Sequence, residues 1–175
     1  MKLYIVRHGE VNHNLLKTYS NENEDLNSTG IMQAEKLKNK MMNLDYDIII
    51  SSPLVRAIHT ANIINNNNKD IVIDDRLKER NSGSLNGKSL QTTNRFEYWN
   101  YYSKIQYGTS ENIQTFFKRI YSFLDDLKFK KYNSVLIVCH SGVSKAIYSY
   151  FNGINNGDFL NKGLDNCEIK EYNLF

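Results

Sequence analysis

The chain has 175 residues, of which 41% are hydrophobic and 23% are charged, and its formal net charge is +3. This composition is typical of a single globular domain and argues against a disordered chain. No apolar run is long enough for a membrane span or a signal peptide. The two cysteines, Cys139 and Cys167, cannot form a disulfide framework, so we expect reduced thiols and a cytoplasmic protein. The basic residues are scattered, which argues against a nucleic-acid partner.

Short apolar runs predict the strands, and apolar residues at helical spacing predict the helices. In chain order we expect a strand at 2–6, a helix at 30–42 capped by Asn27, and a strand at 47–50. A helix should follow with Ser52 as N-cap and Pro53 as first residue, and then a strand at 71–73. The second half should hold a long helix from about 110 to 127, a strand at 135–139, a helix through 150 and a last strand at 167–172. Strands that alternate with helices and are almost continuously apolar predict a mostly parallel sheet covered on both faces. The expected fold class is α/β, in three α/β/α layers.

Three of the predicted strands end directly in residues that can carry chemistry. The first ends in Arg7 and His8, the second precedes Arg56, and the fourth ends at His140. Ligands of open α/β sheets bind outside the carboxyl ends of the strands, so these side chains should meet at one edge. Two arginines and two histidines beside helix N-termini indicate a phosphate-binding pocket, because a guanidinium matches phosphate geometry and a helix N-terminus favours an anion.

Five blocks in order resemble the histidine phosphatase superfamily, also called phosphoglycerate mutase-like. The first is Arg-His-Gly-Glu at 7–10, with Asn14 beyond it, and the third, at 51–61, is the more specific match. The resemblance runs from residue 3 to about 150, with a weaker match at Asn166. The remaining blocks lie at 26–34, 77–87 and 138–142.

Carried over to this sequence, the resemblance implies that His8 is a nucleophile that becomes phosphohistidine. Arg7, Arg56 and His140 would hold the phosphate oxygens, and Glu79 would protonate the leaving oxygen and then activate water. A cationic cluster can supply the positioning and charge neutralisation of phosphoryl transfer without a metal. His8 and Glu10 also lack further ligands at metal spacing, so we expect neither a metal nor a cofactor.

Several residues have two interpretations. Asn14 either steadies the nucleophile loop or contacts phosphate, or it is a plain loop residue. Arg119 falls where the family tends to have an Arg, and we expect it to be a structural ion-pair residue. His13 and His59 are expected at the surface, His59 near the pocket rim. Val11 and Asn27 depart from the hydroxyl residues common in the family.

The spacing from Cys139 to Lys145 is similar to the Cys-x5-Arg loop of cysteine-dependent phosphatases, but it ends in Lys. We expect Cys139 to be a buried strand thiol, because nothing in the sequence indicates a lowered pKa.

The resemblance implies one domain over 1–175 with a lid-like insertion at about 88–110. Its aromatic residues either contact the organic half of a substrate or pack onto the domain. The expected function is a metal-independent phosphomonoesterase for small phosphorylated metabolites. The alternatives are a phosphoglycerate mutase, an α-ribazole phosphatase, or a non-enzymatic phospholigand-binding module. The expected partner is a small phosphate ester, and a homodimer is left open.

Overall fold

A five-stranded sheet forms the centre of the computed structural model, which describes residues 1–154 and 158–175. The strand order is β3-β2-β4-β1-β5, in which β5 is antiparallel to β1 and the other neighbours are parallel. The strands are β1 (Lys2–Arg7), β2 (Ile48–Ser51), β3 (Ile71–Ile73), β4 (Ser134–Cys139) and β5 (Ile169–Asn173).

Both faces of the central strands are buried, which explains why their sequences are apolar without alternation. In β1, Leu3 and Ile5 join one hydrophobic cluster while Tyr4 and Val6 join the other. Successive side chains of a strand point to opposite faces, so a continuous apolar run requires cover on each side. The strand β4 divides in the same way between the two clusters.

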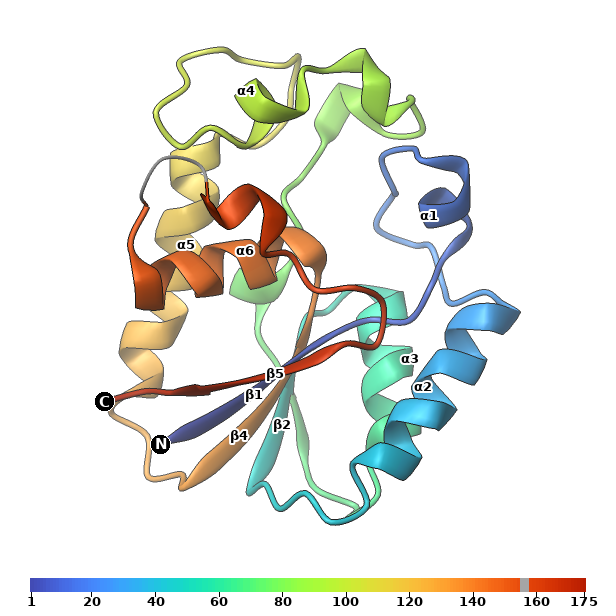
Figure 1. Cartoon of the computed structure of the whole chain (residues 1–175), viewed down its shortest axis with the longest axis vertical. Helices are drawn as coiled ribbons and strands as arrows, with labels where there is room; N and C mark the ends of the chain where they lie inside the picture. Colours follow the sequence, from blue (N-terminus) through green and yellow to red (C-terminus); the bar gives the residue numbers. More distant parts are fainter. Residues whose placement is uncertain (155–157) are drawn as a thin grey trace.

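Helices supply that cover in two layers, α2 and α3 on one face and α5 and α6 on the other (Figure 1). This confirms the expected α/β class with a mostly parallel sheet between helical layers. No helix in the described part of the chain is both long and apolar enough to cross a membrane. The helices are α1 (Asn12–Leu16), α2 (Ser28–Lys40), α3 (Val55–Ile64), α4 (Arg95–Trp99), α5 (Ile113–Leu127) and α6 (Ser141–Asn152), with short 3₁₀ turns η1 (Asp75–Leu77), η2 (Gly83–Leu85), η3 (Leu90–Thr92) and η4 (Asp158–Asn161).

The predicted start of α3 was wrong. The helix begins at Val55 after Leu54, so Pro53 is not its first residue and Ser52 is not its cap. The Ser52 hydroxyl instead accepts a hydrogen bond from the Leu54 N–H and lies 2.8 Å from Nε2 of His140. A turn therefore separates β2 from α3.

Other boundaries shift by one to three residues. The predicted cap Asn27 is confirmed, since its side chain accepts from the Gly30 N–H, but α2 begins at Ser28. Asn112 caps α5, which therefore starts at Ile113 and not near 110. The last strand starts at Ile169 because Cys167 occupies a left-handed turn with φ 55°.

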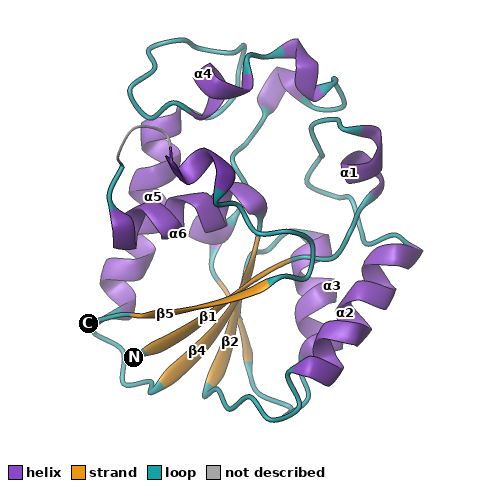
Figure 2. Ribbon diagram, viewed as in Figure 1, coloured by secondary structure: helices purple, strands orange, loops and turns teal. Residues whose placement is uncertain are grey.

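The loops that follow the carboxyl ends of the parallel strands gather at one end of the sheet, where they carry α1 and α4 (Figure 2). The two chain ends meet at the other end, where the amino group of Met1 donates to the carbonyl of Leu174 at 2.9 Å.

Candidate active site

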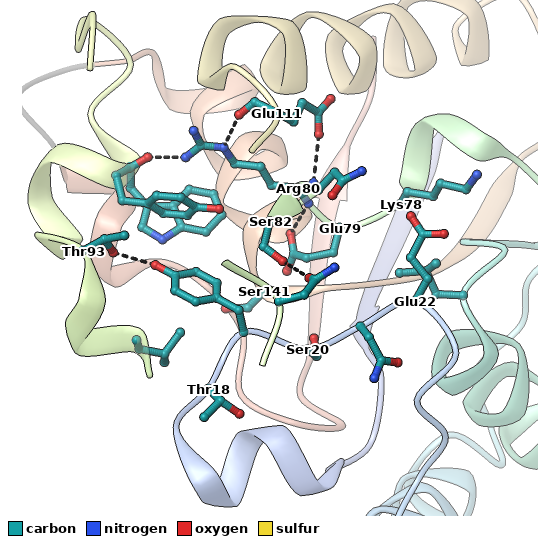
Figure 3. Close-up of a pocket in the computed structure, with 18 of the residues that line it drawn as sticks. Thr18, Ser20, Glu22, Lys78, Glu79, Arg80, Ser82, Thr93, Glu111 and Ser141 are labelled. Atoms are coloured by element: carbon teal, nitrogen blue, oxygen red, sulfur yellow. Dashed lines mark hydrogen bonds between the residues drawn. The ribbon is translucent and has the colours of Figure 1, made fainter. Parts of the chain in front are cut away.

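A cavity of about 1040 Å³ opens among the loops at the carboxyl ends of the strands. Four of the six predicted site residues line it: Arg7, Asn14, Arg56 and Glu79. Figure 3 shows Glu79, Arg80 and Ser141 among the side chains around this cavity. His8 and His140 are buried beside the two arginines and are not on the cavity wall.

His8 follows β1 and is held as a neutral imidazole. Its Nδ1 lies 2.7 Å from the carbonyl of Gly9, a contact that requires the proton on Nδ1 and leaves the lone pair on Nε2. Burial lowers the pKa of His8 well below its usual value, and the charges of Arg56 and Arg7 lower it further. The unprotonated Nε2 is thus available as a nucleophile, although only 4% of the residue is exposed.

The glycine after His8 allows the chain to approach the start of α2. A side chain on Gly9 would collide with the carbonyl of Gly30, and one on Gly30 would collide with the backbone of Glu10. The Gly9 N–H donates to the Thr60 hydroxyl at 3.1 Å. These contacts hold the loop that carries His8 between α2 and α3.

His140 ends β4 and faces His8, with the two ring centroids 5.0 Å apart. Its Nε2 lies 2.8 Å from the Ser52 hydroxyl, while the buried Nδ1 has no partner among the described residues. Burial and the nearby charges of Arg56, His8 and Arg7 lower the pKa of His140 well below its usual value. Because Ser52 was predicted only as a helix cap, its contact with His140 was not expected.

Arg7 and Arg56 bring two guanidinium groups to the histidines. Each donates one hydrogen bond to a backbone carbonyl, Arg7 to Leu164 at 2.9 Å and Arg56 to Asn21 at 2.8 Å. The Nε atoms of both are buried and have no partner among the residues described. Buried, unsatisfied donors on two guanidinium groups suit an anionic ligand.

Glu79 reaches the first turn of α6. Its carboxylate accepts the N–H of Gly142 at 2.9 Å and that of Arg80 at 3.0 Å. A side chain on Gly142 would collide with this carboxylate and with Trp99. The glycine after His140-Ser141 therefore makes room for the predicted proton donor.

Arg119 positions the loop that carries Glu79. It makes a two-bond ion pair with Glu111 at 2.8 and 2.9 Å. It also donates to the carbonyls of Arg76, Lys78 and Glu79. The expected ion pair is present, and the same guanidinium additionally ties three carbonyls of the loop to α5.

Arg80, which was not among the predicted site residues, joins the Glu79 loop to α4. Its Nε donates to the Glu111 carbonyl at 2.8 Å, its Nη1 bonds the Tyr98 carbonyl, and its guanidinium lies 4.0 Å from the centre of the Tyr98 ring (Figure 3). Tyr98 is buried against Trp99, and both line the cavity, whereas Phe96 and Tyr102 are exposed. The aromatic residues of this segment thus both pack and face the cavity.

Asn14 lines the cavity and bonds the segment that follows β1. Its side-chain oxygen accepts from the Val11 N–H at 3.1 Å and from the Asn166 amide at 3.3 Å. Asn166 also donates to the His8 carbonyl at 2.9 Å. The weaker match to the family at Asn166 thus has a structural role.

The two remaining histidines and Cys139 stand apart from the cavity. His59 pairs with Asp25 at 2.8 Å, and His13 pairs with Glu24. Cys139 is fully buried, which raises the pKa of its thiol, so it is the strand thiol that was expected. In the described ranges, no three His, Cys, Asp or Glu side chains are grouped to hold a metal ion.

Comparisons with known proteins agree with this arrangement. The model of the "Histidine phosphatase superfamily (branch 1)" matches residues 3–174. The chain is 32% identical to a protein named uncharacterized phosphatase PhoE from Bacillus subtilis, over 97% of this chain and 93% of that protein. It is 27% identical to phosphoserine phosphatase 1 from Hydrogenobacter thermophilus, over 95% of this chain and 83% of that protein.

A solved structure titled as the α-ribazole phosphatase from Shigella flexneri has the same fold. Its TM-score is 0.85 at 24% identity, over 98% of this chain and 89% of that one. The match of the family model over almost the whole length decides the assignment: the chain belongs to branch 1 of the histidine phosphatase superfamily.

Proposed function

We propose that the protein is a metal-independent phosphomonoesterase that acts through a phosphohistidine at His8. The observation that carries the proposal is a neutral His8 flanked by Arg7 and Arg56, whose buried Nε–H groups lack partners in the described chain. Relatives that include phosphatases agree with it.

In the first step Nε2 of His8 attacks phosphorus while the bond from phosphorus to the ester oxygen breaks. Arg7 and Arg56 neutralise charge on the other three oxygens, and His140, a neutral imidazole, contributes a hydrogen bond. Glu79 gives its proton to the departing oxygen, so the alcohol leaves neutral. The carboxylate is then free to accept a proton from water.

In the second step that water attacks phosphorus, Glu79 takes its proton, and the bond from phosphorus to Nε2 breaks. Inorganic phosphate leaves, and His8 returns to the neutral form with its proton on Nδ1. The Gly9 carbonyl keeps this tautomer through both steps, because it accepts the Nδ1 proton.

The test is rapid chemical quench with ³²P-labelled substrate in the presence of EDTA. The wild-type protein should form an acid-labile, base-stable phosphoprotein and release inorganic phosphate from p-nitrophenyl phosphate. His8→Ala should do neither, whereas His59→Ala, a histidine outside the cavity, should do both. A strict requirement for a divalent metal, or label retained by His8→Ala, would overturn the proposal. Binding of phosphate without any turnover would favour the phospholigand-binding module.

A further inference from the structure

Ser52 carries a buried hydroxyl group to which the proposed reaction gives no role. It follows β2 and is fully buried, as is His140, which follows β4. Its hydroxyl oxygen lies 2.8 Å from Nε2 of His140 and is the one hydrogen-bond partner that the described residues give to this ring. A hydroxyl can donate or accept, so the direction of this bond decides which nitrogen of His140 carries the proton.

The backbone around Ser52 leaves its hydroxyl proton for His140. The N–H of Leu54 donates to the Ser52 oxygen at 3.3 Å, so this oxygen already acts as an acceptor in the turn before α3. The Ser52 carbonyl is occupied separately, because it accepts the hydroxyl of Ser51 at 2.9 Å. Within the described ranges, the acceptor that remains for the Ser52 proton is the lone pair on Nε2 of His140.

The two neutral tautomers of His140 differ in the number of buried groups that they leave unpaired. Burial, and then the charge of Arg56, lower the pKa of His140, so the ring carries one proton. With that proton on Nε2, both the Ser52 proton and the Nδ1 lone pair would lack a partner among the described residues. With the proton on Nδ1, Nε2 accepts from Ser52 and only the Nδ1–H is unpaired. The second tautomer is favoured, because each unpaired buried polar group costs free energy.

The unpaired Nδ1–H of His140 has the same requirement as two other donors of the site. The Nε–H groups of Arg7 and Arg56 are also buried without a partner in the described chain, and the charges of both arginines act on the ring of His140. The ring of His8 lies beside them, 5.0 Å from that of His140. Three unpaired donors beside one neutral nucleophile suit an anion with several oxygen atoms. A lone pair on Nδ1 would instead repel an anionic oxygen.

We propose that Ser52 is a positioning residue that fixes the proton of His140 on Nδ1, so that this ring donates a hydrogen bond to an oxygen of the bound phosphoryl group. The inference rests on the proposed function, in which an anion occupies this site. His8 has the same tautomer in the opposite orientation, since its Nδ1–H is bonded to the Gly9 carbonyl and its unprotonated Nε2 is the proposed nucleophile. The partner of each ring, an acceptor for His8 and a donor for His140, thus gives two neutral histidines different roles.

The first experiment reads the tautomer directly, by ¹⁵N NMR of the full chain labelled at its four histidines. His140, assigned with the His140→Asn variant, should show a protonated Nδ1 and an unprotonated Nε2, both without ligand and with sulfate. Sulfate is the probe because it is a tetrahedral dianion that carries no proton at neutral pH. Ser52→Ala should mix the two tautomers, because nothing then requires a lone pair on Nε2. A wild-type ring protonated on Nε2, or an unchanged ring in a folded Ser52→Ala, would overturn the inference, and the first of these outcomes needs no variant to fold.

The second experiment separates positioning from a structural role. Ser52→Ala should lower kcat/KM about 10- to 100-fold, less than the roughly 10²–10³-fold for removal of a whole donor, because the Nδ1–H tautomer can still form. His140→Asn places an amide NH₂ close to the position of Nδ1 and needs no tautomer, so adding Ser52→Ala to it should cost only about twofold. The control Ser51→Ala removes a neighbouring buried hydroxyl that bonds the Ser52 carbonyl, and it should keep the wild-type kcat/KM. Equal losses from Ser52→Ala in both backgrounds would confine Ser52 to the turn before α3 and refute the inference.

A binding measurement keeps this inference separate from the proposed reaction. Calorimetric titration with sulfate needs no turnover, and Ser52→Ala should weaken binding about tenfold while Ser51→Ala should not. If the wild type forms no phosphoprotein but this pattern holds, the proposed function fails and the role of Ser52 stands. Phosphoprotein formation by a wild type whose His140 is protonated on Nε2 would support the proposed function and refute the role of Ser52. A wild type that does not bind sulfate would refute the donor site itself.

Discussion

Replacing Glu79 by Gln removes the proposed proton donor while preserving its size. The two carboxylate oxygens accept one backbone N–H each, from Gly142 and from Arg80. An amide has a single oxygen, so its NH₂ group would face the second N–H and one bond would be lost. An unpaired, half-buried donor costs about 1–3 kcal/mol. This is less than the roughly 5–15 kcal/mol of a typical domain, so we expect a folded variant with a lower unfolding midpoint.

The kinetic loss in Glu79→Gln should depend on the leaving group. For glycerol 3-phosphate, whose alkoxide needs a proton, we expect kcat to fall about 10²–10⁴-fold. For p-nitrophenyl phosphate, whose leaving group is stable as an anion, bond cleavage should slow about tenfold or less. The measurement is the single-turnover rate of phosphoenzyme formation by rapid quench for each substrate. Label should then accumulate on His8, because water activation has also been lost.

The control is Glu35→Gln, an exposed carboxylate on α2, which should match the wild type with both substrates. Thermal unfolding of Glu79→Gln separates a loss of fold from a loss of chemistry. If bond cleavage slows by the same factor for both leaving groups, Glu79 is not the acid, and its role would be confined to its contacts with α6.

Three further predictions concern residues around the site. Arg119→Met should lower the free energy of unfolding by about 2–4 kcal/mol and reduce kcat. Arg119→Lys should restore neither, because an ammonium cannot make the two parallel bonds of the guanidinium to Glu111. Urea unfolding and steady-state kinetics test this. Gly9→Ala should cost about 1–3 kcal/mol and displace the nucleophile loop, because its methyl group meets the Gly30 carbonyl; wild-type kcat in this variant would refute the close approach. Iodoacetamide at pH 8 should leave Cys139 unlabelled and phosphatase activity intact in the native protein, since burial raises the pKa of this thiol; inactivation that tracks Cys139 labelling by mass spectrometry would contradict this.

Much of the architecture was predictable because it depends on local patterns. The strands at 2–6 and 135–139 are apolar without alternation, and this alone requires a sheet covered on both faces. The positions of Arg7, His8 and His140 at strand ends predicted a shared edge, and the structure brings them together. Their catalytic roles remain predictions.

The sequence by itself determined the fold class and the residues that gather at the sheet edge, because periodicity and strand ends are properties of short segments. Only the tertiary structure decided what each polar group contacts. Ser52 bonds His140 instead of capping a helix, and Arg119 clamps the loop of Glu79 as well as pairing with Glu111. Lys145 shows the reason most clearly: its burial depends on Trp99 and on Gly163, which are distant in sequence, and no local pattern encodes such a contact.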